Sequence, residues 1–369
     1  AEGPRISMLE TLREFAEEQL AESDEQQELQ RRHADWFLEQ AKQIHETIPE
    51  VERAAWMAPF DRELANFRAV FNRCLNGLGD AKTALQLGAR MHYYWYQRGM
   101  ISEGREWLQR SLDQDAGASG RPRAVALQAL ADLERNMGSI DKALQNNLDA
   151  MEIFRSLGDE KDIADNARQL GTIYIHTGEL DRANEYLQTA LDFYRKDDNA
   201  ELLSYTLNVF GGGKQLQGDL DGAQALYEES LELARKVQDP NYLATASLNL
   251  GEVLQVKGDT AAAADSIRES LTLYADKEVN NAVAYCLELL AAIDAAEGRH
   301  GEAAQLFGAA DKIREDIGTP VESFNLERYN QDIDGVKQAL GENAFEQNWQ
   351  EGRALKIAQA VELAQLDFA

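Results

Sequence analysis

Glycines recur along this chain at an almost constant interval. The steps between successive members of the series are 39, 40, 40, 40 and 40 residues, and the members are Gly99, Gly138, Gly178, Gly218, Gly258 and Gly298. A small residue follows five positions later in every case, and these residues are Gly104, Ala143, Ala183, Ala223, Ala263 and Ala303. A fixed period of this length indicates one supersecondary unit repeated along a solenoid, in which each unit packs on its neighbours.

The sequence within each repeat predicts a pair of amphipathic helices. In the clearest copy, Leu170-Gly171 and Tyr174 precede the turn at Gly178, and apolar residues recur three and four apart on both sides of that turn. The glycine ends the first helix, where a positive φ is needed. The residue after the glycine favours the start of the second helix by capping it or by its charge; this residue is Ser139, Glu179, Asp219 or Asp259. We expect the two helices to approach closely at the recurring small residue.

These positions resemble those of the tetratricopeptide repeat family, in which a small residue, an aromatic residue, a glycine and an alanine fall in this order. The family repeat has 34 residues, whereas the repeat here has 40, and we place the additional residues in the second helix and its exit loop, as at 193–198. Six repeats are expected over 80–318, the first of them degenerate. The resemblance implies an all-α fold, a right-handed superhelix of antiparallel helix pairs.

The two ends of the chain do not follow the repeat. Residues 1–79, and 5–16 (RISMLETLREFA) in particular, resemble the end of the winged-helix module and the connecting helices of bacterial STAND-class signal-transduction NTPases. The stretches 306–310 (LFGAA) and 351–355 (EGRAL) resemble the tail of the same regulators, LuxR-type transcriptional activators included. The resemblance implies an NTPase module upstream in the same polypeptide, a helical linker plus a degenerate helix pair over 1–79, and a helical cap over 319–369. The chain does not begin with Met, so we expect it to be a piece of a longer polypeptide.

Charge and composition narrow the range of partners. The formal net charge is −28, which disfavours direct binding to nucleic acid or to an anionic membrane surface. The acids are interpreted as a solvated surface, with a basic partner or a high-salt habitat as alternatives. No apolar run approaches the roughly 20 residues that span a bilayer. Cys74 and Cys286 match no metal spacing and suit a reducing cytoplasm, the expected location.

One stretch, 210–214 (FGGGK), has the glycines and the lysine of a phosphate-binding loop but not its spacing. Gln215 replaces the expected Ser or Thr, and a helical pattern precedes the glycines where a strand is required. A close helix contact or a hinge is the favoured interpretation. The histidines show no metal-binding spacing, the paired acids are typical of solvated helix faces, and no nucleophile elbow is found. The sequence therefore predicts no catalytic residue, no metal site and no cofactor, and an enzyme is the least favoured class.

Binding is the favoured activity. In a tetratricopeptide solenoid the first helix of each pair lines the concave groove, through positions three before, one after, and four or five after its small residue. The resemblance places at these positions Tyr93, Tyr96, Gln97, Arg135, Asn136, Arg168, His176, Asn208, Gln215, Glu252 and Gln255. Aromatic, arginine and amide side chains are types that anchor partners. For each residue taken singly, an ordinary polar group on a wet groove remains the alternative.

Two functions fit these residues. In the first, a protein, a peptide or a small-molecule effector binds in the groove and shifts the state of the attached NTPase or transcriptional regulator. In the second, the chain is a constitutive scaffold or adaptor. Arg135, Arg168 and Asn208 favour this alternative, because such groups grip C-terminal carboxylates, whereas the strong acidity of the chain argues against it.

Overall fold

The computed structural model describes residues 10–46, 53–77, 79–115, 119–197, 199–321 and 325–366. Within these ranges every regular element is an α-helix and no strand occurs, which confirms the all-α fold class. Residue contacts divide the chain into two compact units, Ala1–Ile173 and Tyr174–Ala369. Helix α8 (Glu160–Thr177) contains the division between them.

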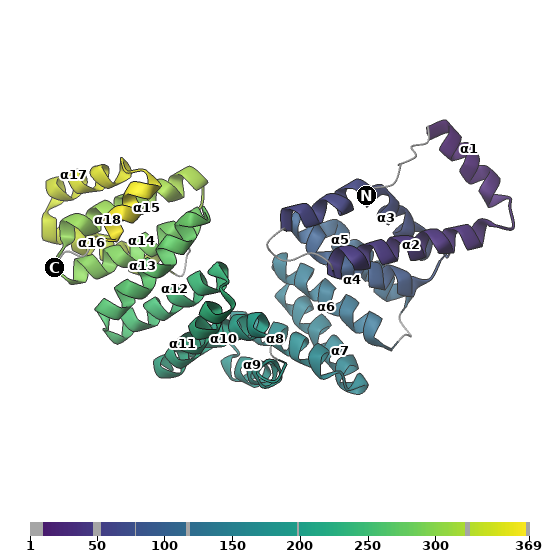
Figure 1. The fold of residues 1–369 in the computed structure, drawn as a ribbon, viewed down its shortest axis with the longest axis horizontal. Coiled ribbons are helices and arrows are strands. Elements are labelled where there is room, and N and C mark those ends of the chain that lie inside the picture. Colours follow the sequence, from purple (N-terminus) through teal and green to yellow (C-terminus); the bar gives the residue numbers. More distant parts are fainter. Residues whose placement is uncertain are drawn as a thin grey trace. The chain divides into compact units, whose positions relative to one another are not determined.

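The described part of the first unit is built of helices (Figure 1). Before α8 these are α1 (Glu10–Ala21), α2 (Gln26–Glu46), α3 (Arg53–Leu75), α4 (Ala81–Gln97), α5 (Ile101–Gln114), α6 (Arg121–Asn136) and α7 (Ile140–Leu157). Helices α4 and α5 form one antiparallel pair and α6 and α7 the next, and the first helices α4 and α6 also pack on each other.

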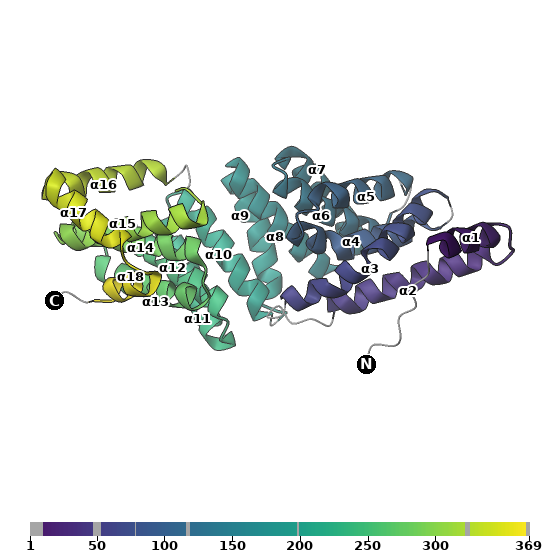
Figure 2. The same cartoon turned by 90° about the horizontal axis from the view of Figure 1, so that it is seen from above.

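The second unit continues the same arrangement and then departs from it. Its pairs are formed by α10 (Ala200–Leu216) with α11 (Leu220–Val237), α12 (Pro240–Lys257) with α13 (Thr260–Asp276), and α14 (Asn280–Ala296) with α15 (His300–Ile317); α9 (Leu180–Tyr194) precedes them. Three shorter helices follow, α16 (Leu326–Leu340), α17 (Glu342–Arg353) and α18 (Ile357–Ala364). Helix α16 lies against α14 and α15 (Figure 2).

The turn glycines adopt the backbone conformation that the sequence predicts. All six have a positive φ, from +68° at Gly99 to +87° at Gly258. This left-handed conformation is strained for residues with a Cβ, so glycine ends the first helix at the lowest energy. The carboxylate of Asp259 then accepts a hydrogen bond of 3.3 Å from the backbone N–H of Ala262, and Asp219 caps α11 in the same way.

The predicted close approach between paired helices is confirmed at the recurring small residues. Their exposed fraction is 0% at each alanine of the series, Ala143, Ala183, Ala223, Ala263 and Ala303. The first-helix glycines have the same role from the opposite side. A Cβ on Gly251 would lie 2.5 Å from Cγ1 of Ile267, so only glycine admits the side chain of α13 at this depth.

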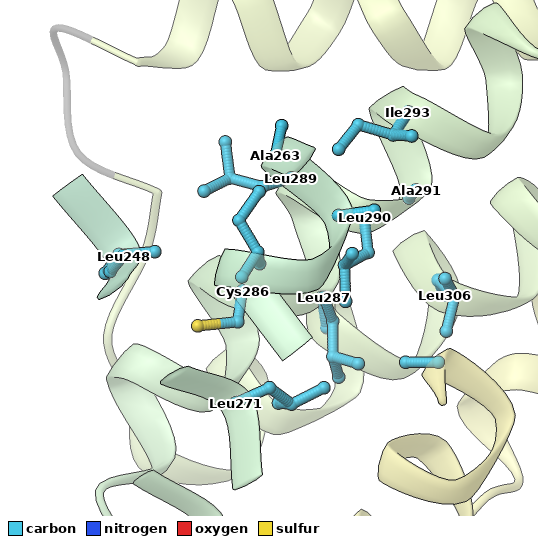
Figure 3. Packing of buried hydrophobic residues seen from close by; sticks show 14 of the residues in the cluster. Leu248, Ala263, Leu271, Cys286, Leu287, Leu289, Leu290, Ala291, Ile293 and Leu306 are labelled. Carbon is cyan, nitrogen blue, oxygen red and sulfur yellow. The ribbon is translucent and has the colours of Figure 1, made fainter. Parts of the chain in front are cut away.

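Leucine, isoleucine and alanine side chains fill the space between the pairs. Figure 3 shows side chains of α12, α13, α14 and α15 converging on one core, in which Leu271 and Leu287 are both 0% exposed. Helix α14 contributes residues on more than one face, because it packs against α13, α15 and α16. Burial on several sides agrees with its sequence, in which only Glu288 and Asp294 are charged.

The C-terminal helices are held to the last pair by a crossing of two backbones. A Cβ on Gly308 of α15 would lie 2.2 Å from the carbonyl oxygen of Trp349, and a Cβ on Gly352 of α17 would lie 2.0 Å from the carbonyl oxygen of Gln305. Beside this crossing, the Arg353 guanidinium donates hydrogen bonds to carboxylates of α15. Both helices therefore require glycine where they cross.

We predict that Gly308→Ala lowers the free energy of unfolding by about 1–3 kcal/mol, because the added methyl group overpacks against a carbonyl that cannot move freely. The matched control is Gly335→Ala in α16, where a Cβ would meet nothing within 4 Å. That substitution should stabilise the chain by about 0.5–1 kcal/mol through the helix preference of alanine. Urea unfolding of both variants measures the difference, and equal effects would contradict the crossing.

Candidate functional site

The first helix of each pair carries the predicted binding residues. Neighbouring first helices pack on each other, α4 on α6 in the first unit, and α10 on α12 and α12 on α14 in the second. Polar side chains from successive pairs consequently meet. The predicted residues are described below by the unit to which they belong.

Tyr93, Tyr96 and Gln97 lie together at the end of α4. The amide of Gln97 donates a hydrogen bond of 2.6 Å to the Tyr93 hydroxyl, and the rings of Tyr93 and Tyr96 have centroids 6.3 Å apart. Tyr93 also packs edge-on against Trp56 of α3, with centroids 5.5 Å apart. Tyr96 is 44% exposed, whereas Tyr93 is partly buried, so Tyr96 presents the larger aromatic surface to solvent.

Asp132 joins three first helices of the first unit, although sequence analysis did not single it out. Its Oδ2 accepts a hydrogen bond of 3.0 Å from the Gln169 amide of α8, and lies 3.8 Å from Nε2 of His92 on α4. The two predicted residues of α6 also face it. Arg135 lies 3.8 Å from its carboxylate, and the Asn136 amide donates 2.7 Å to its backbone carbonyl. Asp132 lies six residues before the turn glycine of its repeat, as Tyr93 and Glu252 do in theirs. Its position in the repeat could therefore have identified it.

Helix α8 places its two predicted residues differently. Arg168 is half-buried, while His176, two turns later, is exposed. Arg168 belongs to the first unit and His176 to the second.

Asn208 is a buried link between helices rather than a surface residue. Only 8% of it is exposed, and its amide donates to the Ser230 hydroxyl of α11 at 2.8 Å and to the Ser204 carbonyl at 3.1 Å. Its Oδ1 accepts a bond of 3.4 Å from Asn249 of α12. About two turns further along α10, Gln215 is half-buried and accepts a hydrogen bond of 3.3 Å from the Tyr227 hydroxyl.

Glu252, Tyr285 and Arg328 form a polar cluster on α12, α14 and α16. The Tyr285 hydroxyl donates to the Glu252 carboxylate and receives a bond of 3.4 Å from Nη2 of Arg328. Burial raises the pKa of Glu252, and the Tyr285 hydrogen bond and the Arg328 charge oppose that rise. Gln255 is half-buried one turn further along α12.

A buried ion pair lies next to this cluster. Arg314 of α15 binds Glu288 of α14 through two hydrogen bonds, 2.5 Å from Nε and 3.0 Å from Nη2, and reaches Asn281 at 3.1 Å. Burial raises the pKa of Glu288, and Arg314 opposes the rise. Tyr285 and Glu288 lie on the first helix of the sixth repeat. The sequence analysis predicted no binding residue in that repeat. Arg328 lies beyond the repeats, where no register could point to it.

Two kinds of reactive site, a metal-binding cluster and an ionised thiol, are not found among the described residues. No group of three or more His, Cys, Asp or Glu side chains among them could hold a metal ion. Burial raises the pKa of the Cys74 thiol to about 11 and of the Cys286 thiol to about 12, so both thiols stay protonated at neutral pH.

The glycine-rich stretch is part of helix α10 and forms no loop. A Cβ on Gly211 would lie 2.4 Å from the Tyr227 ring, so this glycine makes room for a helix contact, one of the two interpretations given above. Lys214 lies over the Phe210 ring at 5.6 Å and 3.4 Å from the carboxylate of Asp219. In the part of the chain that the structure describes, no helix is long and apolar enough to cross a membrane.

The family comparison agrees with the helix pairs. The family model described as "Tetratricopeptide repeat" matches residues 122–196 and 202–276. These two segments are tetratricopeptide repeats. The first segment includes α6 to α9 and the second includes α10 to α13.

Among curated proteins, the chain is 31% identical over 129 residues to a protein named as a candidate HTH-type transcriptional regulator of Mycobacterium tuberculosis (strain ATCC 25618 / H37Rv). A protein of the same description from Mycobacterium bovis gives the same values. The match includes 35% of this chain but spans only 14% of the regulator's length.

Solved structures show the fold alone, because their sequence identity is low. The apo form of RapI has a TM-score of 0.58 at 13% identity, and the match covers 90% of this chain and 95% of RapI. A Rap protein complexed with Competence and Sporulation Factor has a TM-score of 0.50 at 15% identity, with 86% and 98% of the two chains covered. BtubC (BKLC) from P. vanneervenii has a TM-score of 0.51 at 19% identity, with coverage of 63% and 93%.

We predict that Tyr285→Phe lowers the free energy of unfolding at pH 7 by about 1–3 kcal/mol, because the half-buried Glu252 carboxylate loses its hydroxyl donor. The control is Tyr96→Phe, whose side chain is 44% exposed and which should change stability by less than about 0.5 kcal/mol. Urea unfolding distinguishes the two variants. An unchanged free energy of unfolding in Tyr285→Phe would show that the hydrogen bond to Glu252 does not stabilise the fold.

The pH dependence of the same cluster has a defined sign. A carboxyl group whose pKa is higher in the folded protein than in the unfolded chain stabilises most below the unfolded pKa, and that stability is lost as pH rises through the folded pKa. Glu252→Gln should therefore raise the thermal midpoint relative to the parent chain at pH 7, and the gain should shrink toward pH 4.5. The control is Glu232→Gln, at an exposed position of α11.

Proposed function

We propose that this chain is a binding region that recognises a protein or peptide through its first-helix surfaces and thereby regulates a larger protein. The observation that carries the proposal is the sharing of polar side chains between neighbouring first helices. In the first unit the surface consists of Tyr93, Tyr96, Gln97, Asp132, Arg135 and Asn136; in the second it consists of Gln215, Glu252, Gln255 and Tyr285. Asn208 is left out because it is buried, and the roles of Arg168 and His176 are supported only by their register.

The chemistry of these surfaces suits recognition. Half-buried polar groups held in fixed geometry select partners strongly, because a mismatched partner leaves them without hydrogen bonds. The exposed ring of Tyr96 adds apolar contact area, as tyrosine often does in interfaces. With a net charge of −28, the chain favours a basic partner over an acidic one.

The comparisons support a regulatory setting. One structure of similar fold is a Rap protein complexed with Competence and Sporulation Factor, and the curated relatives are named as transcriptional regulators. We propose that the chain works in the bacterial cytoplasm, without cofactor and without its own catalytic activity, as the sensor region of a STAND-class NTPase or transcriptional regulator. The alternative function, a constitutive scaffold, uses the same surfaces but produces no change in an attached module.

We predict that a peptide selected on the immobilised chain from a random display library binds through a first-helix surface. Tyr96→Ala in the first unit or Gln255→Ala in the second should weaken binding at least tenfold, equivalent to about 1.4 kcal/mol. The controls are Gln109→Ala and Glu232→Ala, exposed residues of the second helices α5 and α11. Fluorescence anisotropy gives the affinities, which should also fall with added salt.

Loss of binding only in the control variants would overturn the proposed surfaces. The regulatory part has its own test, because the coding sequence upstream of Ala1 shows whether an NTPase module precedes the chain. In the natural polypeptide, the selected peptide should change the nucleotide hydrolysis rate or DNA binding. Binding with no such change would favour the scaffold.

A further inference from the structure

A cavity lies near the N-terminus, outside the segments that match the repeat family. It has a volume of about 410 Å³ and lies among α2, the end of α3 and the start of α4. Its lining includes Gln30, His33, Val70, Arg73, Cys74 and Thr83. A volume of this size is within the range of small-molecule sites, which runs from about 300 to 1,000 Å³.

Arg73 brings a positive charge to this cavity without an acidic partner among the described residues. Its Nη1 lies 3.4 Å from Nδ1 of His33. Burial, and secondarily the charge of Arg73, lowers the pKa of His33, so the neutral imidazole adds no second positive charge beside the guanidinium.

The carboxylates that line the cavity are already engaged elsewhere. Asp35 lies 3.3 Å from the guanidinium of Arg31, and Asp80 accepts a hydrogen bond of 3.0 Å from the backbone N–H of Lys82 as the cap of α4. An anionic ligand thus meets the Arg73 charge beside two carboxylates, of which Asp35 is paired with Arg31, a further lining residue. This balance favours a ligand of single negative charge over a doubly charged one.

Gln30 supplies a second polar group that lacks a partner. It is only 9% exposed, and its Oε1 receives no hydrogen bond from the part of the chain that the structure describes. A buried amide oxygen without a donor is unfavourable, because it has lost its water without gaining a hydrogen bond. A ligand with an N–H or O–H group can supply the missing donor.

We propose that this cavity binds a small organic monocarboxylate. The carboxylate pairs with the Arg73 guanidinium, a ligand donor satisfies Gln30, and the apolar part of the ligand packs on Val70 and Ala34. This site is independent of the first-helix surfaces, so either proposal can fail without the other.

The test uses the complete 369-residue chain and a panel of monocarboxylates: hexanoate, benzoate, indole-3-acetate and N-acetylglycine. Isothermal titration calorimetry should detect binding of at least one of them, and its amide analogue should bind at least tenfold more weakly. Arg73→Gln should weaken binding at least tenfold, whereas Arg32→Gln should leave it unchanged, because Arg32 is an exposed arginine of α2 that does not line the cavity.

A second measurement keeps the proposal falsifiable if Arg73→Gln fails to fold. Cys74 lines the cavity, and Cys286, also buried, belongs to the other unit. Because both thiols are protonated at neutral pH, alkylation of the parent chain is followed at pH 9 with excess iodoacetamide; the bound carboxylate should slow the reaction of Cys74 at least threefold, as read by mass spectrometry, and leave Cys286 unaffected. Absence of binding by the whole panel, equal binding of the amides, tighter binding of inorganic phosphate, or equal protection of both cysteines would overturn the proposal.

Discussion

Close contact between the two helices of each pair is the interaction on which the rest of the structure depends. It requires a small residue at one fixed position, and every alanine of the series is completely buried there. Where the first helix contributes glycine, a larger side chain of the partner helix enters, as Tyr227 does at Gly211. Because the pair is closed in this way, the first helices of successive pairs come into contact, and the polar clusters follow from that contact.

The repeated features of the fold could be predicted from the sequence because they depend on local chemistry. A positive φ at Gly258 and the burial of Ala183 are consequences of the glycine and alanine positions alone. The family model confirms that two segments are tetratricopeptide repeats. The crossing of α15 and α17 was beyond such prediction, since Gly308 and Gly352 come from segments that do not share a repeat.

The residues of the candidate site were predicted less completely than the repeated features of the fold. Register correctly places Glu252 on a first helix, but says nothing about Arg328, which reaches it from a helix outside the repeats. The position of Asn208 in the repeat also predicts a surface residue, but the side chain is buried. Two small hydroxyl residues, Ser204 and Ser230, let the helices approach and enclose its amide. Sequence spacing predicts the helix face, whereas burial depends on the neighbouring side chains.

The proposed function depends on one claim, that partners bind on the first helices of the pairs. Hydrogen exchange measured by mass spectrometry, with and without a selected peptide, tests it most directly. We predict that the peptide slows exchange in α4 and α6, or in α12 and α14, and leaves exchange unchanged in the second helices of the same pairs. Protection confined to α5 and α7, or to α11 and α13, would contradict it.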